Sequence, residues 1–145
     1  MSIDALIGID YAWIAIDCDG QVGVFTSGGA GPIPRWFADE RVWCDAVLDA
    51  VASLPVRGTF RLEVPVAAAV PGLRDWKRWA GVGLFAYDWV DAHRSTVEYT
   101  RCYELIATPT NPIEACAMPA KLREQPVLAG ICFARSHLVD VSPFA

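Results

Sequence analysis

Hydrophobic residues occur in short runs whose length suits β-strands. Residues 12–17 (AWIAID) and 22–27 (VGVFTS) flank the tetrapeptide Cys18-Asp19-Gly20-Gln21. An Asp-Gly pair supplies the positive φ angle of a tight turn, so the pattern predicts a β-hairpin. Because AWIAI is apolar on both faces, we expect its strand to lie in the centre of a sheet and to be covered on each side.

Two segments show the spacing of amphipathic helices. Asp39 can cap a helix over residues 40–53, which Pro55 would stop. A second, shorter helix is predicted over residues 72–80 and would end at Gly81. In the first helix the apolar positions that recur at helical spacing are Trp43, Val47, Ala50, Val51 and Leu54.

Three further strands are predicted over residues 59–64, 82–90 and 97–108. In the last of these, Val97, Tyr99, Tyr103, Leu105 and Ala107 alternate with mostly polar residues. The proline-punctuated remainder allows a helical turn or two over residues 120–124 and a last strand within residues 127–141. Together these elements predict an α+β fold, a single mixed and mainly antiparallel sheet with one main helix and one or two short helices packed on it.

The composition is that of a single folded domain. The chain has 145 residues, of which 54% are hydrophobic and 20% charged, enough to enclose a hydrophobic core. The longest apolar run, residues 64–73, is interrupted by Pro65, Pro71 and Gly72 and is shorter than the ~20 residues that span a bilayer. The amino-terminal sequence has no basic leader or cleavage site, so a cytoplasmic location without membrane association is expected.

Charge and cysteine usage narrow the function further. The formal net charge of −5 argues against nucleic acid as a partner and favours a basic one. Five cysteines are scattered without a CxxC pair, so they are interpreted as reduced thiols, mostly buried, and no metal site is predicted.

The segment SGGAGPIPRWF, residues 27–37, has the glycine content of a phosphate loop but not its pattern. It matches neither GxGxxG nor GxxxxGK[ST], and Pro32 and Pro34 remove two backbone donors that a phosphate cradle would use. It is therefore interpreted as a loop between hairpin and helix. Trp36 and Phe37 either pack into the core beneath the helix, or Arg35 and Trp36 form a rim of partner contacts.

No catalytic constellation is predicted, and no cofactor. His93 lies in DAHRS between Asp91 and Ser95, but a Ser-His-Asp triad is assembled from distant positions and its nucleophile needs an exposed elbow. The DCDG tetrapeptide lacks the remaining ligands of a calcium loop. Asp88, between aromatic residues, is expected to pair with a cation such as Arg101 rather than to act as an acid or base.

Two parts of the chain carry a resemblance. Residues 13–34 (WIAIDCDGQVGVFTSGGAGPIP), and residues 84–89 (LFAYDW) with residues 103–113 (YELIATPTNPI), resemble small bacterial proteins encoded near polymorphic or contact-dependent toxins. The resemblance covers less than half of the chain. It implies an immunity protein that neutralises a toxin by binding it, and it carries no catalytic residues to this chain.

Three hypotheses follow. The first is a non-enzymatic protein-binding domain whose partner is a basic toxin domain. Its candidate partner contacts are Asp17 and Asp19 at the hairpin tip and Arg35 and Trp36 in the loop. The second is a small enzyme or ligand-binding domain with a pocket near Asp88, His93 and Arg101. The third is a homodimeric structural subunit that covers its aromatic residues in its own interface.

Overall fold

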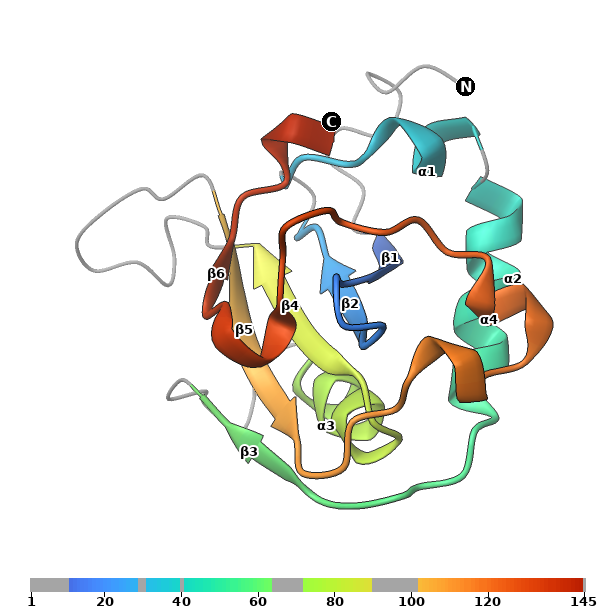
Figure 1. The fold of residues 1–145 in the computed structure, drawn as a ribbon, viewed down its shortest axis with the longest axis vertical. Coiled ribbons are helices and arrows are strands. Elements are labelled where there is room, and N and C mark those ends of the chain that lie inside the picture. Colours follow the sequence, from blue (N-terminus) through green and yellow to red (C-terminus); the bar gives the residue numbers. More distant parts are fainter. Residues whose placement is uncertain (1–10, 29–30, 40, 64–71, 90–101, 145) are drawn as a thin grey trace.

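The computed structural model describes residues 11–28, 31–39, 41–63, 72–89 and 102–144 (Figure 1). Within these ranges six strands form one sheet in the order β1-β2-β4-β5-β3, with β6 also paired to β5. Strands β2 and β4 are parallel and the other pairs are antiparallel. The strands are β1 (Ala12–Ile16), β2 (Val22–Thr26), β3 (Phe60–Leu62), β4 (Phe85–Trp89), β5 (Tyr103–Pro109) and β6 (Leu138–Val139). The predicted α+β fold with a mixed, mainly antiparallel sheet is confirmed.

The predicted hairpin is confirmed, but its position in the sheet is not the expected one. Strand β1 pairs with β2 from Ala12 opposite Thr26 to Ile16 opposite Val22, yet β1 is the first strand in the order and not a central one. An irregular segment pairs with its outer edge at Ile16. The Ile16 N–H donates to the Pro126 carbonyl at 2.9 Å, and the Leu128 N–H donates to the Ile16 carbonyl at 2.8 Å.

The helices lie where the apolar spacing predicts them. Helix α2 (Arg41–Ala52) and helix α3 (Leu73–Gly81) match the two predicted helices, and α4 (Ala120–Arg123) matches the predicted short turn. Helix α1 (Arg35–Asp39) is additional and occupies the end of the glycine-rich segment. Short 3-10 helices span Ala115–Ala117, Phe133–Arg135 and Ser142–Phe144. No helix within the described ranges is long and apolar enough to cross a membrane.

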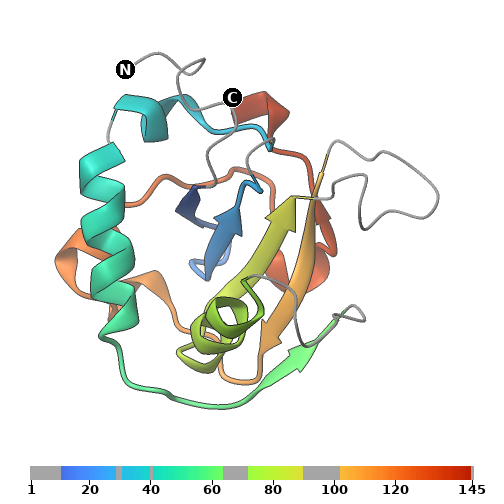
Figure 2. The ribbon, with the colours of Figure 1, turned by 180° about the vertical axis from the view of Figure 1, so that it is seen from behind.

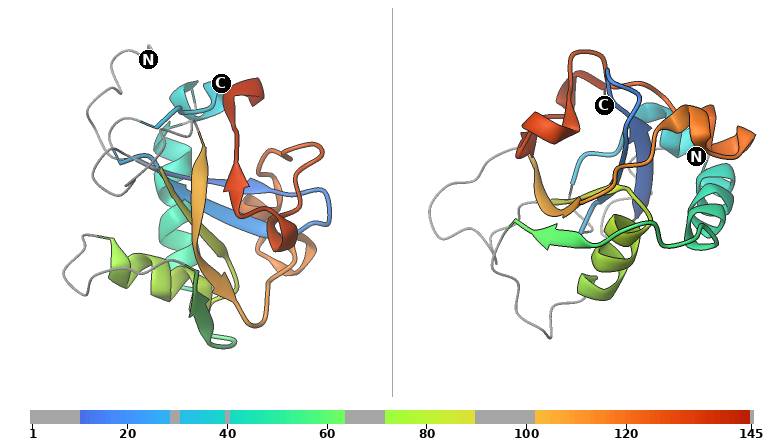
Figure 3. Two further views of the ribbon diagram at one scale, coloured as in Figure 1. Left: turned by 90° about the vertical axis from the view of Figure 1, so that its left-hand side faces the viewer. Right: turned by 60° about the horizontal axis from the view of Figure 1, so that its bottom comes forward.

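A separate hydrophobic cluster covers each face of the sheet. Figure 2 shows α2 and α3, which pack on the aliphatic cluster. The aromatic cluster on the opposite face is covered by α1 and the carboxyl-terminal segment (Figure 3). The aliphatic cluster includes Ile14, Val24, Val47, Val51, Trp76, Leu84 and Ile106, and the aromatic one includes Trp13, Phe25, Phe37, Tyr87, Tyr103 and Phe133. Burial on both faces explains the continuous apolar run of β1.

Strand β5 departs from the predicted alternation at one point. Its register against β4 shifts between Ala86 and Tyr87, which leaves one extra residue in β5. As a result Ala107 and Ile106 are buried in the same aliphatic cluster, while Leu105 belongs to the aromatic cluster. The prediction that Ala107 shares a face with Tyr103 and Leu105 is wrong because a β-bulge resets the alternation. The predicted strand residues 97–101 lie outside the described ranges.

Candidate functional site

The hairpin turn is organised by the buried carboxylate of Asp17. Its Oδ1 accepts hydrogen bonds from the Asp19 N–H and the Gln21 N–H, each at 2.9 Å. Its Oδ2 accepts one from the Phe133 N–H at 2.8 Å. Asp17 is only 1% exposed, so this carboxylate holds the turn against the carboxyl-terminal segment and does not face a partner.

The exposed side chain of Asp19 contacts the thiol of Cys132, and Cys18 precedes it in the chain. Its Oδ2 accepts a hydrogen bond from the Cys132 thiol at 3.0 Å. One ligand atom from each of Asp17, Asp19 and Cys132 lies within 4.8 Å of the others, and the hydrogen bonds of the two carboxylates account for this closeness. The expected burial of the cysteines holds for Cys132 but is wrong for Cys18 and Cys116, whose side chains are exposed.

Arg35 and Trp36 lie at the other end of the hairpin. Arg35 is exposed, while Trp36 is half-buried and packs edge-on against Trp13 with ring centroids 6.1 Å apart. Phe37 is fully buried. Helix α1 follows the end of β2, whereas Asp19 lies in the turn before the start of β2. The predicted contacts Asp17 and Asp19 therefore lie at one end of the hairpin, and Arg35 and Trp36 at the other.

The glycine-rich segment before α1 is a packing corner. The Tyr103 hydroxyl donates to the Pro32 carbonyl at 3.0 Å. A Cβ atom added to Gly31 would lie 2.7 Å from the same hydroxyl oxygen and 2.9 Å from the Ser27 carbonyl oxygen. Glycine is therefore needed here for a close approach of the backbone to the core.

Asp88 is the described member of the predicted pocket. It is buried, and its Oδ1 accepts a hydrogen bond from the Thr26 hydroxyl at 2.5 Å. The Trp76 indole N–H donates to the same hydroxyl oxygen at 3.2 Å. His93 and Arg101 lie outside the described residues, so the predicted pocket and the Asp88–Arg101 ion pair are not tested.

Among the described residues, no segment pairs with the outer side of β3. The Thr110 N–H donates to the Thr59 carbonyl at 3.0 Å, and the Glu63 N–H donates to the Ile106 carbonyl at 2.9 Å. Since backbone groups alternate in direction along an antiparallel strand, the N–H and C=O groups of Phe60 and Leu62 point away from β5.

Hydrophobic side chains line this edge. Phe60 and Leu62 are each 37% exposed, and Leu138 of β6 is 46% exposed. Both β3 and β6 pair with the side of β5 that faces away from β4, so they follow one another along one edge (Figure 1). The Lys77 ammonium lies 5.9 Å from the centre of the Phe60 ring. We call Phe60, Leu62 and Leu138, with the outward backbone groups of β3, the open edge.

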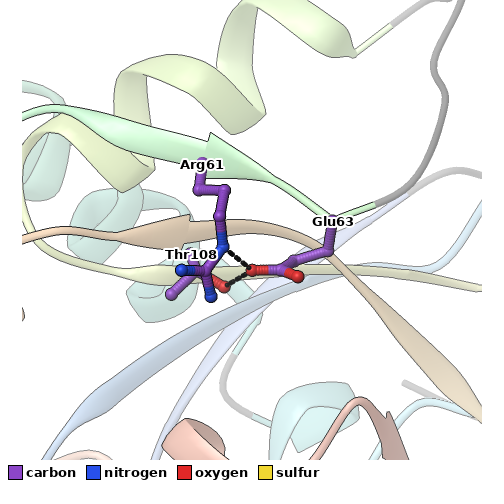
Figure 4. A network of polar contacts seen from close by, with 3 residues as sticks. All are labelled: Arg61, Glu63 and Thr108. Carbon is purple, nitrogen blue, oxygen red and sulfur yellow. Dashed lines mark hydrogen bonds and ion pairs between the residues drawn. The ribbon is translucent and has the colours of Figure 1, made fainter.

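Charged side chains alternate with these apolar ones. The Glu63 carboxylate accepts hydrogen bonds from the Thr108 hydroxyl and the Arg61 guanidinium, each at 2.7 Å (Figure 4). The Thr108 hydrogen bond is the main cause that holds the pKa of Glu63 below its ordinary value, and Arg61 adds to it against the effect of burial. Glu63 is therefore ionised at neutral pH.

The sequence predicted the β3 strand but not its place at the edge. The alternation Phe60, Arg61, Leu62, Glu63 was the available signal, since charged residues are typical of edge strands. Comparison of the chain with protein-family models, curated proteins and solved structures gave no match.

Proposed function

We propose that this chain is a non-enzymatic protein-binding domain that holds an extended segment of its partner against the open edge. The observation that carries the proposal is the pair of residues Phe60 and Leu62, whose backbone groups point outward from the last strand of the sheet. An added strand obtains its affinity from such main-chain hydrogen bonds and its specificity from alternate side chains.

The chemistry of the open edge supports a particular kind of partner segment. Apolar side chains of the partner would pack beside Phe60 and Leu62, and charged ones beside Arg61 and Glu63. The net charge of −5 favours a partner that is basic overall, because long-range attraction raises the association rate. Exposed Asp19 contributes to this field from the hairpin tip.

The resemblance to proteins of toxin loci supports a biological role for such binding. In this role the chain is an immunity protein, and its partner is a basic toxin domain encoded beside it. Neutralisation then requires only that the bound edge blocks the toxin surface, since no covalent step is involved.

The test measures binding of the purified chain to the toxin domain encoded next to its gene. Leu62→Pro removes an outward N–H, and proline is tolerated on an edge strand. The matched control is Val127→Pro. Val127 is also an exposed apolar residue, and it lies opposite Ile16 at the other edge of the sheet. The hydrogen bonds to Ile16 are made by Pro126 and Leu128, so the N–H of Val127 itself points outward. We expect Leu62→Pro to weaken binding about tenfold or more and Val127→Pro to leave it unchanged.

Two results would contradict the proposal. Binding that survives Leu62→Pro but is lost in the double variant Asp19→Ala and Arg35→Ala would move the contact to the ends of the hairpin. A dimer of the chain that dissociates on dilution and is abolished by Leu62→Pro would make a second copy the occupant of the open edge, as the homodimer hypothesis requires.

A further inference from the structure

The hairpin turn and the carboxyl-terminal segment bring two cysteines to facing positions. The Cys18 N–H donates to the Ile131 carbonyl at 2.9 Å. In a parallel pair, the residue whose N–H donates stands opposite the residue that follows the acceptor, which here is Cys132. The Cys132 backbone has φ −124° and ψ 111°, which are the values of a parallel strand.

This hydrogen bond brings the backbones of Cys18 and Cys132 to the separation that a disulfide can join. Neighbouring strands lie about 4.7–4.9 Å apart, and a disulfide joins residues whose Cα atoms are roughly 4.4–6.8 Å apart. Ile16 pairs with Val127 in the same parallel direction, and a turn in which the Ile131 N–H donates to the Leu128 carbonyl at 3.2 Å separates this pairing from the Cys18 contact. Figure 3 shows the hairpin turn beside the carboxyl-terminal segment.

The two thiols differ in access to solvent. Cys18 is exposed, whereas Cys132 is buried and its thiol donates to the Asp19 carboxylate at 3.0 Å. The Arg135 guanidinium contacts the Cys132 sulfur, and this contact raises the pKa of Arg135. An external reagent therefore reaches Cys18 before Cys132.

We propose that Cys18 and Cys132 form a reversible disulfide when the protein meets a low-molecular-weight disulfide such as oxidised glutathione. The Cys18 thiolate attacks one glutathione sulfur, forms a mixed disulfide and releases one glutathione thiolate. The deprotonated Cys132 sulfur then attacks Cys18 and releases the second glutathione thiolate. The protein loses two electrons and two protons, and oxidised glutathione is reduced to two molecules of glutathione.

The surroundings of Cys18 set the speed of the first step. Desolvation raises the pKa of the Cys18 thiol, and the charges of Asp19 and Asp17 and the nearby Cys132 raise it further. Since the thiolate is the nucleophile, the first step is slow at neutral pH and accelerates as pH rises. Asp19→Asn removes one of these charges and leaves the Cys132 thiol a neutral amide acceptor in place of a carboxylate, so we expect it to increase the rate severalfold.

The experiment treats the reduced full chain with oxidised glutathione and follows intact mass, then maps the linked peptides. We expect a mass decrease of two hydrogen atoms, a Cys18–Cys132 peptide, and a thermal unfolding midpoint higher by about 5–10 °C. In Cys132→Ser a glutathione adduct should accumulate at Cys18. The control variant is Cys116→Ser, because Cys116 is also exposed and its thiol also donates to a carboxylate, that of Glu114, at 3.5 Å. This variant should still form the internal disulfide.

Either of two outcomes would overturn the proposal. One is a glutathione adduct at Cys18 that persists in the wild-type chain, because Cys132 would then be out of reach. The other is oxidation that yields only links between chains or adducts at other cysteines.

Discussion

Replacement of Asp17 tests whether the hairpin turn depends on one buried carboxylate. Three backbone N–H groups donate to it, those of Asp19, Gln21 and Phe133. The first two lie in the turn and the third lies in the carboxyl-terminal segment. Loss of the carboxylate therefore disrupts the turn and detaches it from that segment.

The size of the effect follows from the number of bonds. A hydrogen bond to a charged group contributes about 1.5–3 kcal/mol, and the values are not additive when one group makes several bonds. We expect Asp17→Ala to lower the free energy of unfolding by about 4 kcal/mol, which is large for a single substitution. Asp17→Asn should cost about 2 kcal/mol, because the amide keeps one carbonyl acceptor and places a donor against the Phe133 N–H.

Urea denaturation followed by tryptophan fluorescence measures these changes. Asp19→Ala is the control, since the exposed Asp19 side chain accepts a hydrogen bond from a weak donor, the Cys132 thiol, and we expect its loss to cost less than about 1 kcal/mol. If Asp17→Ala costs no more than Asp19→Ala, the carboxylate does not hold the turn, and Asp17 returns as a contact for the partner.

Two further predictions concern packing and pH. Gly31→Ala should lower the free energy of unfolding by about 2 kcal/mol or more in the same urea assay, because its Cβ would collide with the Tyr103 hydroxyl. The control is Gly20→Ala, where φ is +80° but the space around the residue is open, so the substitution should cost only about 1–2 kcal/mol of backbone strain. Equal costs for the two variants would refute the collision. The lowered pKa of Glu63 contributes stability that is complete above the unfolded-state pKa and is lost as pH falls through the folded-state pKa. Thr108→Val removes the main cause of that shift, so the stability difference from wild type should be largest at neutral pH and shrink in acid; a constant difference would contradict the role of Glu63.

Local patterns were sufficient for the elements but not for their neighbours. The Asp19-Gly20 turn and the apolar spacing of α2 depend on residues close in sequence, and both were predicted. The apolar faces of β1 correctly indicated burial on both sides. They could not distinguish a central strand from an edge strand covered by residues 126–131, because that cover comes from the far end of the chain.

The candidate site was less predictable for the same reason. Asp17 and Asp19 are equivalent in sequence as acidic residues of a turn, yet the Phe133 N–H, more than a hundred positions away, commits one of them to the fold. Cys132 likewise becomes relevant only because Ile131 accepts a hydrogen bond from Cys18. Contacts of this kind depend on the complete fold and leave no periodic signal in the sequence.

The two edge strands of the sheet, β1 and β3, differ in the hydrogen bonds that their outward backbone groups make, and the proposed function depends on this difference. At β1, Pro126 and Leu128 supply hydrogen bonds to the outer edge at Ile16, and the proposed disulfide would join the hairpin turn to the same segment. At β3, the outward groups of Phe60 and Leu62 have no such cover among the described residues, and β3 is only three residues long. Short edge strands with charged side chains resist indiscriminate pairing. In the proposed function, the Arg61–Glu63 pair would discourage unspecific strands, while the apolar positions of β3 would still accept a matching strand of the partner.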